Sequence, residues 1–323
     1  MAWLPDRQQV RGPERPALRD IEPLNRVFAD AFTDRYRRDG MSGVRVPHLN
    51  PSIWRYAIED AGEGAMIWRD SDGSLCAFNM VHLSGCEGWM GPLAVRPDRQ
   101  GSGLGKLMLQ SGIAWLQARG ARTIGLETMP RTVENIGFYS QLGFVPRHLT
   151  VTLTHDLARR PTVAPRVLSA AGPERAAQIG SCASLTDALV PGTDFTRELQ
   201  TTTDLRIGNT LLEREADGTL TGFALFHTAP LAAGRPQEEL RILKLVARDM
   251  ETLERLLVQA EAAAVSADIH RVSVRCQTAG SEAYQHLVRR GFRTHWTDLR
   301  MTLASHPEAV VPPGAVVWSN WEI

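Results

Sequence analysis

A glycine-rich segment at residues 93–106 combines residue types that could bind an anionic ligand. Its sequence is LAVRPDRQGSGLGK, an apolar strand that ends at Pro97, a turn with glycines at alternate positions, and the beginning of a helix. Glycine lets a backbone adopt positive φ and approach a ligand closely. The unpaired amides at a helix N-terminus, together with the helix dipole, attract anions. The segment therefore predicts a site for a phosphate or diphosphate group.

Two widespread phosphate-binding patterns do not match this segment. The P-loop pattern GxxxxGK[ST] requires glycine where Gln100 stands and serine or threonine where Leu107 stands. The dinucleotide pattern GxGxxG requires a third glycine where Lys106 stands, and no βαβ unit with a downstream acidic residue supports it. A nucleotide-binding protein is therefore disfavoured, and a plain strand-to-helix turn stays as the alternative for this loop.

The loop also resembles a motif of the GNAT superfamily of N-acetyltransferases. The pattern QxxGxG at residues 100–105 fits that family's [QR]xxGx[GA], and it begins five residues after Val95 of the preceding strand. A second segment, FYSQLGF at residues 138–144, resembles the family's helix-and-turn signature, in which an aromatic-tyrosine pair precedes Gly-Phe. Its tyrosine, Tyr139, lies 39 residues beyond the start of the first motif. The two motifs span most of residues 20–155.

This resemblance implies that acetyl-CoA is the co-substrate and that no metal takes part. Main-chain amides of the loop would hold the CoA diphosphate, and a strand that splays from its neighbour would pair with the pantetheine arm. The Leu93 N–H would stabilise the oxyanion, and Tyr139 would protonate the leaving thiolate. A helix tyrosine that merely packs on the sheet is the alternative for Tyr139. The residues assigned to the cofactor are Leu93, Ala94, Val95, Gln100, Gly101, Ser102, Gly103, Leu104, Gly105, Lys106, Asn135 and Tyr139.

The chain departs from the family pattern in two places. Thr132 stands where many relatives carry a cofactor-binding asparagine, and Asn135 lies four residues before the tyrosine, so a cofactor contact and a helix cap both stay open for it. The strand positions that often carry a general-base glutamate, residues 89–91, are Trp-Met-Gly. Glu87 and Glu127 are the remaining candidates for the base, although each could equally be a surface carboxylate.

The hydrophobic pattern predicts the elements that would position these residues. Helices are expected at 24–36, 53–58, 103–119 and 133–142, and strands at 64–69, 75–83, 89–95, 123–128 and 147–153. This order predicts an α+β fold. With the resemblance, it implies a mixed, mostly antiparallel sheet that is flanked by helices and contains a splayed strand pair.

An internal repeat indicates that the domain is duplicated. Asp-Gly at residues 72–73, a hairpin turn signal, recurs at 217–218, and Gly-Phe at 143–144 recurs at 291–292. We therefore expect two tandem GNAT-like domains, residues 1–160 and 161–323. The boundary falls in the proline-containing stretch at 159–165.

The second half is expected to have lost the CoA site. The offset that aligns the two halves places the loop on residues 249–254, DMETLE, which has no glycine and three carboxylates. This half would then cover a sheet edge and wall the acceptor cleft. The apolar tail at 316–323 is expected to dock as a strand, with a position near the cleft as one option. The loop at 40–48 fits either a substrate lid or a plain helix connection.

Composition narrows the class of protein. Lys plus Arg equals Asp plus Glu, 36 each, so the chain lacks the basic excess of a nucleic-acid binder. The four cysteines have no metal-ligand spacing. Residues 1–7 lack a signal-peptide core and no stretch has the length of a membrane span, so we expect a cytoplasmic protein. The scarcity of lysine beside arginine is typical of GC-rich bacteria.

The function that follows from the resemblance is transfer of an acetyl or short acyl group from acyl-CoA to a primary amine by direct attack. The acceptor could be a small molecule or a peptide, and the protein a monomer or a homodimer, with neither nucleic acid nor membrane as partner. A non-catalytic acyl-CoA-binding regulatory protein is the alternative.

Overall fold

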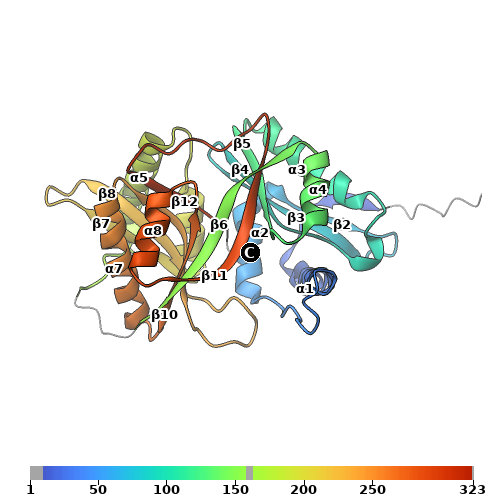
Figure 1. Ribbon diagram of the computed structural model, residues 1–323, viewed down its shortest axis with the longest axis horizontal. Helices are drawn as coiled ribbons and strands as arrows, with labels where there is room; N and C mark the ends of the chain where they lie inside the picture. Colours follow the sequence, from blue (N-terminus) through green and yellow to red (C-terminus); the bar gives the residue numbers. More distant parts are fainter. Residues whose placement is uncertain (1–9, 158–162, 322–323) are drawn as a thin grey trace, which may run out of the picture.

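A computed structural model describes residues 10–157 and 163–321 of the chain. Two lobes lie side by side, and one curved sheet of twelve strands runs through both (Figure 1). Ten helices and strands of the first half carry the predicted site. They are β1 (Arg11–Glu14), α1 (Ile21–Arg38), α2 (Pro51–Ala61), β2 (Ala65–Arg69), β3 (Leu75–Ser84), β4 (Glu87–Val95), α3 (Leu104–Ala118), β5 (Thr123–Thr128), α4 (Val133–Gln141) and β6 (Phe144–Asp156).

The second half repeats the order from α1 to β6, and it ends with one additional strand. It consists of α5 (Gly172–Leu189), α6 (Thr196–Asp204), β7 (Gly208–Arg214), β8 (Leu220–His227), β9 (Leu240–Ala247), α7 (Met250–Ser266), β10 (Arg271–Gln277), α8 (Ser281–Arg289), β11 (Arg293–Leu303) and β12 (Val316–Ser319). The predicted α+β order is thus confirmed in both halves. β1 was not predicted, because its residues are exposed and polar and carry no strand periodicity.

The two predicted hairpin turns have the same local structure. In each, a glycine adopts positive φ, +85° at Gly73 and +87° at Gly218. The preceding aspartate accepts a hydrogen bond from the amide two residues on, at 2.8 Å for Asp72 and 2.9 Å for Asp217. This aspartate turn explains why Asp-Gly recurs at these positions.

The halves exchange their last long strands. In the sheet, β11 of the second half lies between β5 and β6 of the first, and β6 pairs with β10 of the second half. Figure 1 shows β6 and β11 crossing the middle of the molecule together. The second half therefore extends the sheet of the first half by main-chain pairing, whereas we had expected it to cover an edge. The predicted boundary at 159–165 lies partly outside the described residues.

Helices cover both faces of the sheet and enclose its cores. In the first half, α3 and α4 cover one face with a cluster that includes Met108, Leu116 and Leu126. α1 and α2 cover the other face around Leu24 and Trp54. Successive residues of a strand point to opposite faces of the sheet, so β5 directs its side chains alternately towards the face of α3 and α4 and towards the face of α1 and α2. This alternation decides which side chains of β5 reach the predicted site.

The C-terminal tail docks as a strand, as predicted. β12 pairs antiparallel with β9, Trp318 opposite Leu245, and the chain then continues to Trp321. Residues 322–323 lie outside the described residues. The predicted loop 40–48 ends against the second half, where the His48 carbonyl accepts a hydrogen bond from the Ala233 amide at 2.9 Å.

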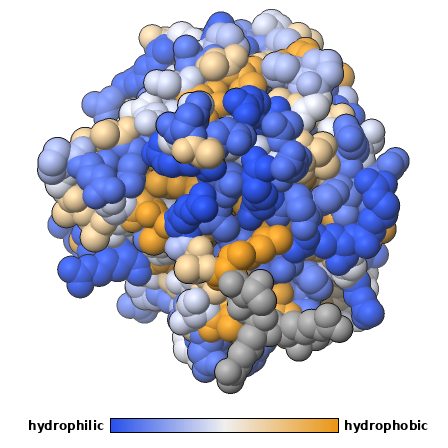
Figure 2. Space-filling view, turned by 90° about the vertical axis from the view of Figure 1, so that its left-hand side faces the viewer, coloured by the Kyte–Doolittle hydropathy of each residue, from blue (hydrophilic) through white to orange (hydrophobic). Residues whose placement is uncertain are grey.

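The outer end of the second lobe is largely hydrophilic, with small separate apolar patches (Figure 2). Among the residues that the structure describes, no helix has both the length and the apolar character needed to cross a membrane.

Candidate active site

β4 and β5 separate in the middle of the sheet. Their parallel pairing runs from Glu87↔Thr123 to Met90↔Leu126 and stops there, although β4 continues to Val95. The pairing of β4 with β3 shifts at the same place, so that β4 carries one extra residue between Met90 and Leu93. Such a β-bulge bends its strand. The result is the splayed strand pair that the family resemblance implies.

A buried dyad contacts the backbone of this bulge. His82 Nε2 lies 3.0 Å from the Gly91 carbonyl oxygen, and Nδ1 lies 2.5 Å from an oxygen of Asp60. The other oxygen of Asp60 accepts from Arg197 Nε at 3.0 Å. Because a carbonyl only accepts, His82 must donate through Nε2. The dyad therefore anchors the Gly91 carbonyl within the bulge, and nothing in the sequence pattern pointed to it.

The glycine-rich loop joins the open end of β4 to α3. Gly103 is the N-cap of α3 with φ +88°, and Gly101 has φ +76°. Side chains other than glycine adopt such angles rarely, so the loop needs these glycines. The Gln100 side chain donates back to the Val95 carbonyl at 3.1 Å and closes the turn. The first amides of α3 have no acceptor within the helix and point out of its end.

A cavity of about 620 Å³ extends from this loop past the open edge of β4. Ten of the twelve predicted cofactor residues line it, as does Glu127. Leu104 is instead packed in the core, and the Ser102 hydroxyl donates to the Arg99 carbonyl at 2.7 Å. Their predicted contact with the cofactor could therefore come only from the backbone.

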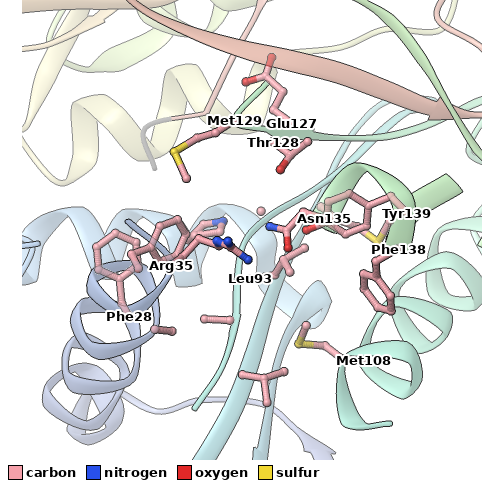
Figure 3. A pocket seen from close by; sticks show the side chains of 18 of the residues that line it. Phe28, Arg35, Leu93, Met108, Glu127, Thr128, Met129, Asn135, Phe138 and Tyr139 are labelled. Atoms are coloured by element: carbon pink, nitrogen blue, oxygen red, sulfur yellow. The ribbon is translucent and has the colours of Figure 1, made fainter. Parts of the chain in front are cut away.

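Figure 3 shows Leu93, Asn135 and Tyr139 on one side of the cavity and the Arg35 side chain entering it from α1. Tyr139 is 5% exposed and lies against the rings of Phe138 and Phe144. Burial raises its pKa to about 12, so its hydroxyl keeps its proton at neutral pH. Tyr139 therefore presents a protonated hydroxyl in this cavity.

The two predicted base candidates differ in position. Glu87 is not among the described residues that line the cavity, because it lies two residues behind Trp89 on β4, away from the opening. Its carboxylate accepts from the Ser319 hydroxyl at 2.8 Å. This position does not favour Glu87 as the base, and its hydrogen bond instead joins β4 to the C-terminal strand.

Glu127 lines the cavity but is already paired. Arg300 donates to one oxygen at 2.7 Å and Arg275 to the other at 2.5 Å. Burial by itself would raise the pKa of Glu127, but the two guanidinium groups outweigh it and lower that pKa. A carboxylate held anionic by two cations is a weak proton acceptor.

The second half contributes to the cavity wall, as we expect from the sequence, through residues that the sequence did not identify. Arg275 of β10, Asp298 of β11 and Trp321 of the tail all line the cavity. Burial raises the pKa of Asp298 to about 6, although the Arg275 guanidinium opposes the rise. Asp298 could not be found from sequence, because only the strand exchange brings it to the first half.

Two tryptophans and two cations form the inner end of this wall. The rings of Trp89 and Trp321 are 5.5 Å apart, with Arg300 over the first at 3.7 Å and Lys244 over the second at 3.6 Å. These stacks hold the tail in place. They explain the burial of Lys244, one of the chain's two lysines.

The corresponding place in the second half differs in structure. β9 and α7 are joined by residues 248–249 alone, whereas residues 96–103 join β4 to α3. Glu251 and Glu254 therefore lie inside α7, which corrects the expectation that they stand in a loop. Asp249 caps α7 by accepting from the Thr252 amide at 2.7 Å. A side-chain carboxylate thus occupies the helix end that could otherwise bind an anion.

In the second half, the C-terminal strand β12 occupies the place where β9 separates from β10. β9 pairs with β10 only from Leu240 to Ile242, and beyond this point β12 pairs with β9 from Lys244 to Ala247. The segment of β9 that corresponds to the open edge of β4 is therefore already paired.

Comparison with known proteins agrees with this geometry. Residues 26–144 match the family model described as Acetyltransferase (GNAT) family. This part of the chain is a GNAT domain. Within the described residues no group of His, Cys, Asp and Glu side chains could hold a metal ion. No curated protein sequence matches the chain significantly.

Three solved structures share the fold over almost the whole chain. A GCN5-related N-acetyltransferase from Sphaerobacter thermophilus is 18% identical with a TM-score of 0.60, covering 96% of this chain and 98% of its own. A tandem GNAT protein from the clavulanic acid biosynthesis pathway is 13% identical with a TM-score of 0.56. The match covers 93% of this chain and 100% of that protein's chain. The Saccharomyces cerevisiae N-myristoyltransferase with bound myristoyl-CoA is 11% identical with a TM-score of 0.61, covering 91% and 82%. The GNAT fold therefore extends through both halves.

Proposed function

We propose that this protein transfers an acetyl or other short acyl group from acyl-CoA to a primary amine by direct attack of the amine on the thioester. The observation that carries the proposal is the coincidence of three features in one cavity. These are an unpaired strand edge at Leu93–Val95, a helix N-terminus with a glycine loop at residues 101–106, and the protonated hydroxyl of Tyr139.

Each feature matches one part of the coenzyme thioester. The helix-end amides between Gly101 and Lys106 bind the diphosphate, which the helix dipole favours. The free edge of β4 pairs with the amide groups of the pantetheine arm as an added strand would. The Leu93 N–H then faces the thioester oxygen and stabilises the negative charge that develops there. Asn135 lines the same wall and is proposed to contact the arm.

Tyr139 completes the transfer. When the amine nitrogen bonds to the carbonyl carbon and the carbon–sulfur bond breaks, the thiolate takes the Tyr139 proton. The phenol suits this role because its raised pKa keeps it protonated until the thiolate forms. A route through a cysteine nucleophile has no support among the cavity-lining residues, none of which is a cysteine in the described part of the chain.

We further propose that the chain consists of two GNAT-like domains, residues 1–160 and 161–323, of which only the first binds acyl-CoA. The capping carboxylate of Asp249 and the tail strand β12 occupy the two positions that a coenzyme would need in the second domain. The second domain instead contributes a strand and part of the cavity wall to the first.

Thermal shift and thiol release test this function. Acetyl-CoA at a hundredfold excess over its Kd should stabilise the protein by about 2.7 kcal/mol, whereas ATP should not. Gly103→Glu should abolish this stabilisation, because it strains a residue at φ +88° and places a carboxylate against the diphosphate. Gly218→Glu is the matched control, since Gly218 has φ +87° and equally open surroundings in the other half.

An amine panel then tests the transfer itself. Thiol release should require both acetyl-CoA and an amine and should fall as the acyl chain lengthens. If CoA stabilises the protein but no amine is acylated, the proposed enzymatic function is wrong, and the alternative of an acyl-CoA-binding regulatory protein is favoured. A Gly103→Glu variant that still responds to acetyl-CoA would overturn the proposed diphosphate site.

A further inference from the structure

Among the described residues, four carboxylates line the cavity, and one of them belongs to the second half. They are Asp34 of α1, Glu127 of β5, Glu134 of α4 and Asp298 of β11. An amine that arrives as an ammonium ion needs one of them as a partner. It must also lose a proton before its nitrogen can attack. The acceptor's partner must therefore lie beside the thioester site and must not already be neutralised by other cations.

Ion pairs account for three of the four. Asp34 pairs with Arg37 and with Arg38, the latter at 2.6 Å. Glu134 is largely exposed and pairs with Arg35 at 2.8 Å.

Glu127 has two guanidinium partners and the Thr150 hydroxyl. Asp298 has one cationic partner among the described residues, Arg275 at 3.0 Å, and shares it with Glu127. Of the three cavity-lining carboxylates that are at least largely buried, Asp298 has the fewest cationic partners in the described part of the chain.

Strand register places Asp298 level with the opening of β4. Pairing of β4 with β5 stops at Met90, so Leu93 lies alongside the last residues of β5. β11 pairs with β5 through Leu299↔Thr128, and Asp298 lies one residue further towards the same end. Leu93 and Asp298 thus lie on the two strands that flank the end of β5, where β4 has already separated from β5. This leaves room for a thioester carbonyl and an attacking nitrogen between them.

The side chain points to the face where an acceptor can enter. Leu299 packs against the core beneath α3 and α4, so Asp298 turns to the opposite face, towards α1. There Tyr36 of α1 faces it, and the negative charge of Asp298 adds to burial in raising the pKa of that tyrosine. The indole of Trp296 donates to Asp298 at 3.2 Å and fixes the carboxylate.

We infer that Asp298 of the second half binds the ammonium group of the acceptor and accepts its proton. This inference rests on the proposed function and names the residue that prepares its nucleophile. It gives the second domain a chemical role: the first domain holds the acyl donor, and the second receives the acceptor.

The proton and electron pairs balance as follows. The ammonium ion gives one proton to Asp298, which returns it to solvent, and the freed nitrogen lone pair forms the bond to the thioester carbon. When the carbon–sulfur bond breaks, the sulfur keeps its electron pair and takes the Tyr139 proton. The second proton of the attacking nitrogen returns to the Tyr139 oxygen. The products are an amide, CoA thiol and one released proton.

The charged and titratable groups around Asp298 support this role. Arg275 of β10 favours its anion, whereas Glu127 of β5 and burial oppose it, and the resulting pKa of about 6 leaves it ionised at neutral pH. Tyr36 of α1 carries no charge there. An ionised carboxylate with a pKa near the working pH is suited to accept a proton.

Asp298→Asn tests the inference in the full-length protein, with Asp156→Asn as the matched control. Asp156 is an exposed carboxylate on β6 that pairs with Arg271. We expect Asp298→Asn to keep the thermal stabilisation by acetyl-CoA, to lower kcat/KM for the amine about 100-fold, and to lose the acidic limb of the pH–rate profile. Asp298→Glu should restore part of the rate with a shifted acidic limb.

Several results would overturn the inference. One is an Asp298→Asn enzyme whose kcat/KM and pH profile match those of Asp156→Asn. If Asp298→Asn does not fold, an Asp298→Glu enzyme with an unshifted acidic limb would overturn it equally. A wild-type protein that binds acetyl-CoA and acylates no amine would remove the proposed function along with this role. If the wild-type protein acylates an amine and Asp298→Asn does so at the same rate, only the proposed role of Asp298 is overturned, and the proposed function stands.

Discussion

The guanidinium of Arg275, on a strand of the second half, lies 2.5 Å from the carboxylate of Glu127, on a strand of the first. The same nitrogen lies 3.0 Å from Asp298. One guanidinium therefore bridges two carboxylates at the junction of the halves. Because all three groups line the cavity, the ion pair that joins the halves also shapes the site.

Arg275→Met should destabilise the protein by about 2 kcal/mol, because two largely buried carboxylates lose a charged hydrogen bond. The measurement is urea unfolding of the whole chain. Arg271→Met on the same strand is the control, since its partner Asp156 is exposed, and it should cost less than about 1 kcal/mol. Equal effects of the two substitutions would show that Arg275 has no special role at the junction.

Tyr139→Phe should lower kcat about 100-fold while leaving the Kd for acetyl-CoA within about twofold. Its ring packs as before, and only the proton donor is lost. Because burial raises the pKa of Tyr139 to about 12, the wild-type rate should not decline through its ionisation between about pH 7 and about pH 10.

Tyr284→Phe is the control, because Tyr284 lies in α8, the helix of the second half that corresponds to α4. This substitution should change neither kcat nor the Kd for acetyl-CoA. Loss of coenzyme binding in Tyr139→Phe would show that the hydroxyl holds the coenzyme and does not act as a proton donor.

Glu198 should make stability depend on pH. It is buried on α6 near Lys244 and Ser84, and burial, with the nearby Asp60, raises its pKa from 4.5 to about 7. The folded protein therefore holds a proton between these pH values that the unfolded chain has released. This stabilisation is complete below about pH 4.5 and is lost as pH rises through about 7.

Glu198→Gln should accordingly flatten the decline in the free energy of unfolding between about pH 5 and about pH 7.5. Urea titrations of both proteins across this range check it. Glu213→Gln, another buried glutamate of the second half, gives the background slope. A decline in Glu198→Gln as steep as in wild type would show that other groups cause it.

Local features could be predicted from the sequence because local residues determine them. The Asp-Gly turns, the glycine loop, the helix at α3 and the element order depend on neighbours within a few positions, and the structure agrees with them apart from the unpredicted β1. Tyr139 and Leu93 were located through their motifs, and the structure brings them to one cavity.

Pairings between distant segments could not be predicted in this way. Hydrophobic alternation indicates which face of a strand is buried, but it does not indicate which strand lies alongside. β11 has the same pattern whether it returns to its own half or crosses to β5. Asp298 and Arg275 therefore look like ordinary polar strand residues until the crossing is known. Glu87 was a candidate for the base from its place near the strand, but the sequence does not indicate how far along β4 the cavity extends, and Glu87 is not among the described residues that line it.

The crossing of β6 and β11 also governs when the protein becomes complete during synthesis. A nascent chain that has emerged as far as β6 has no partner for the free side of β5, because that partner lies at residues 293–303. The cavity wall requires Trp321, still later in translation. Premature termination anywhere before these residues therefore yields a polypeptide without a finished site. We therefore expect the first half, expressed alone, to lack the part of the cavity wall that Arg275, Asp298 and Trp321 form.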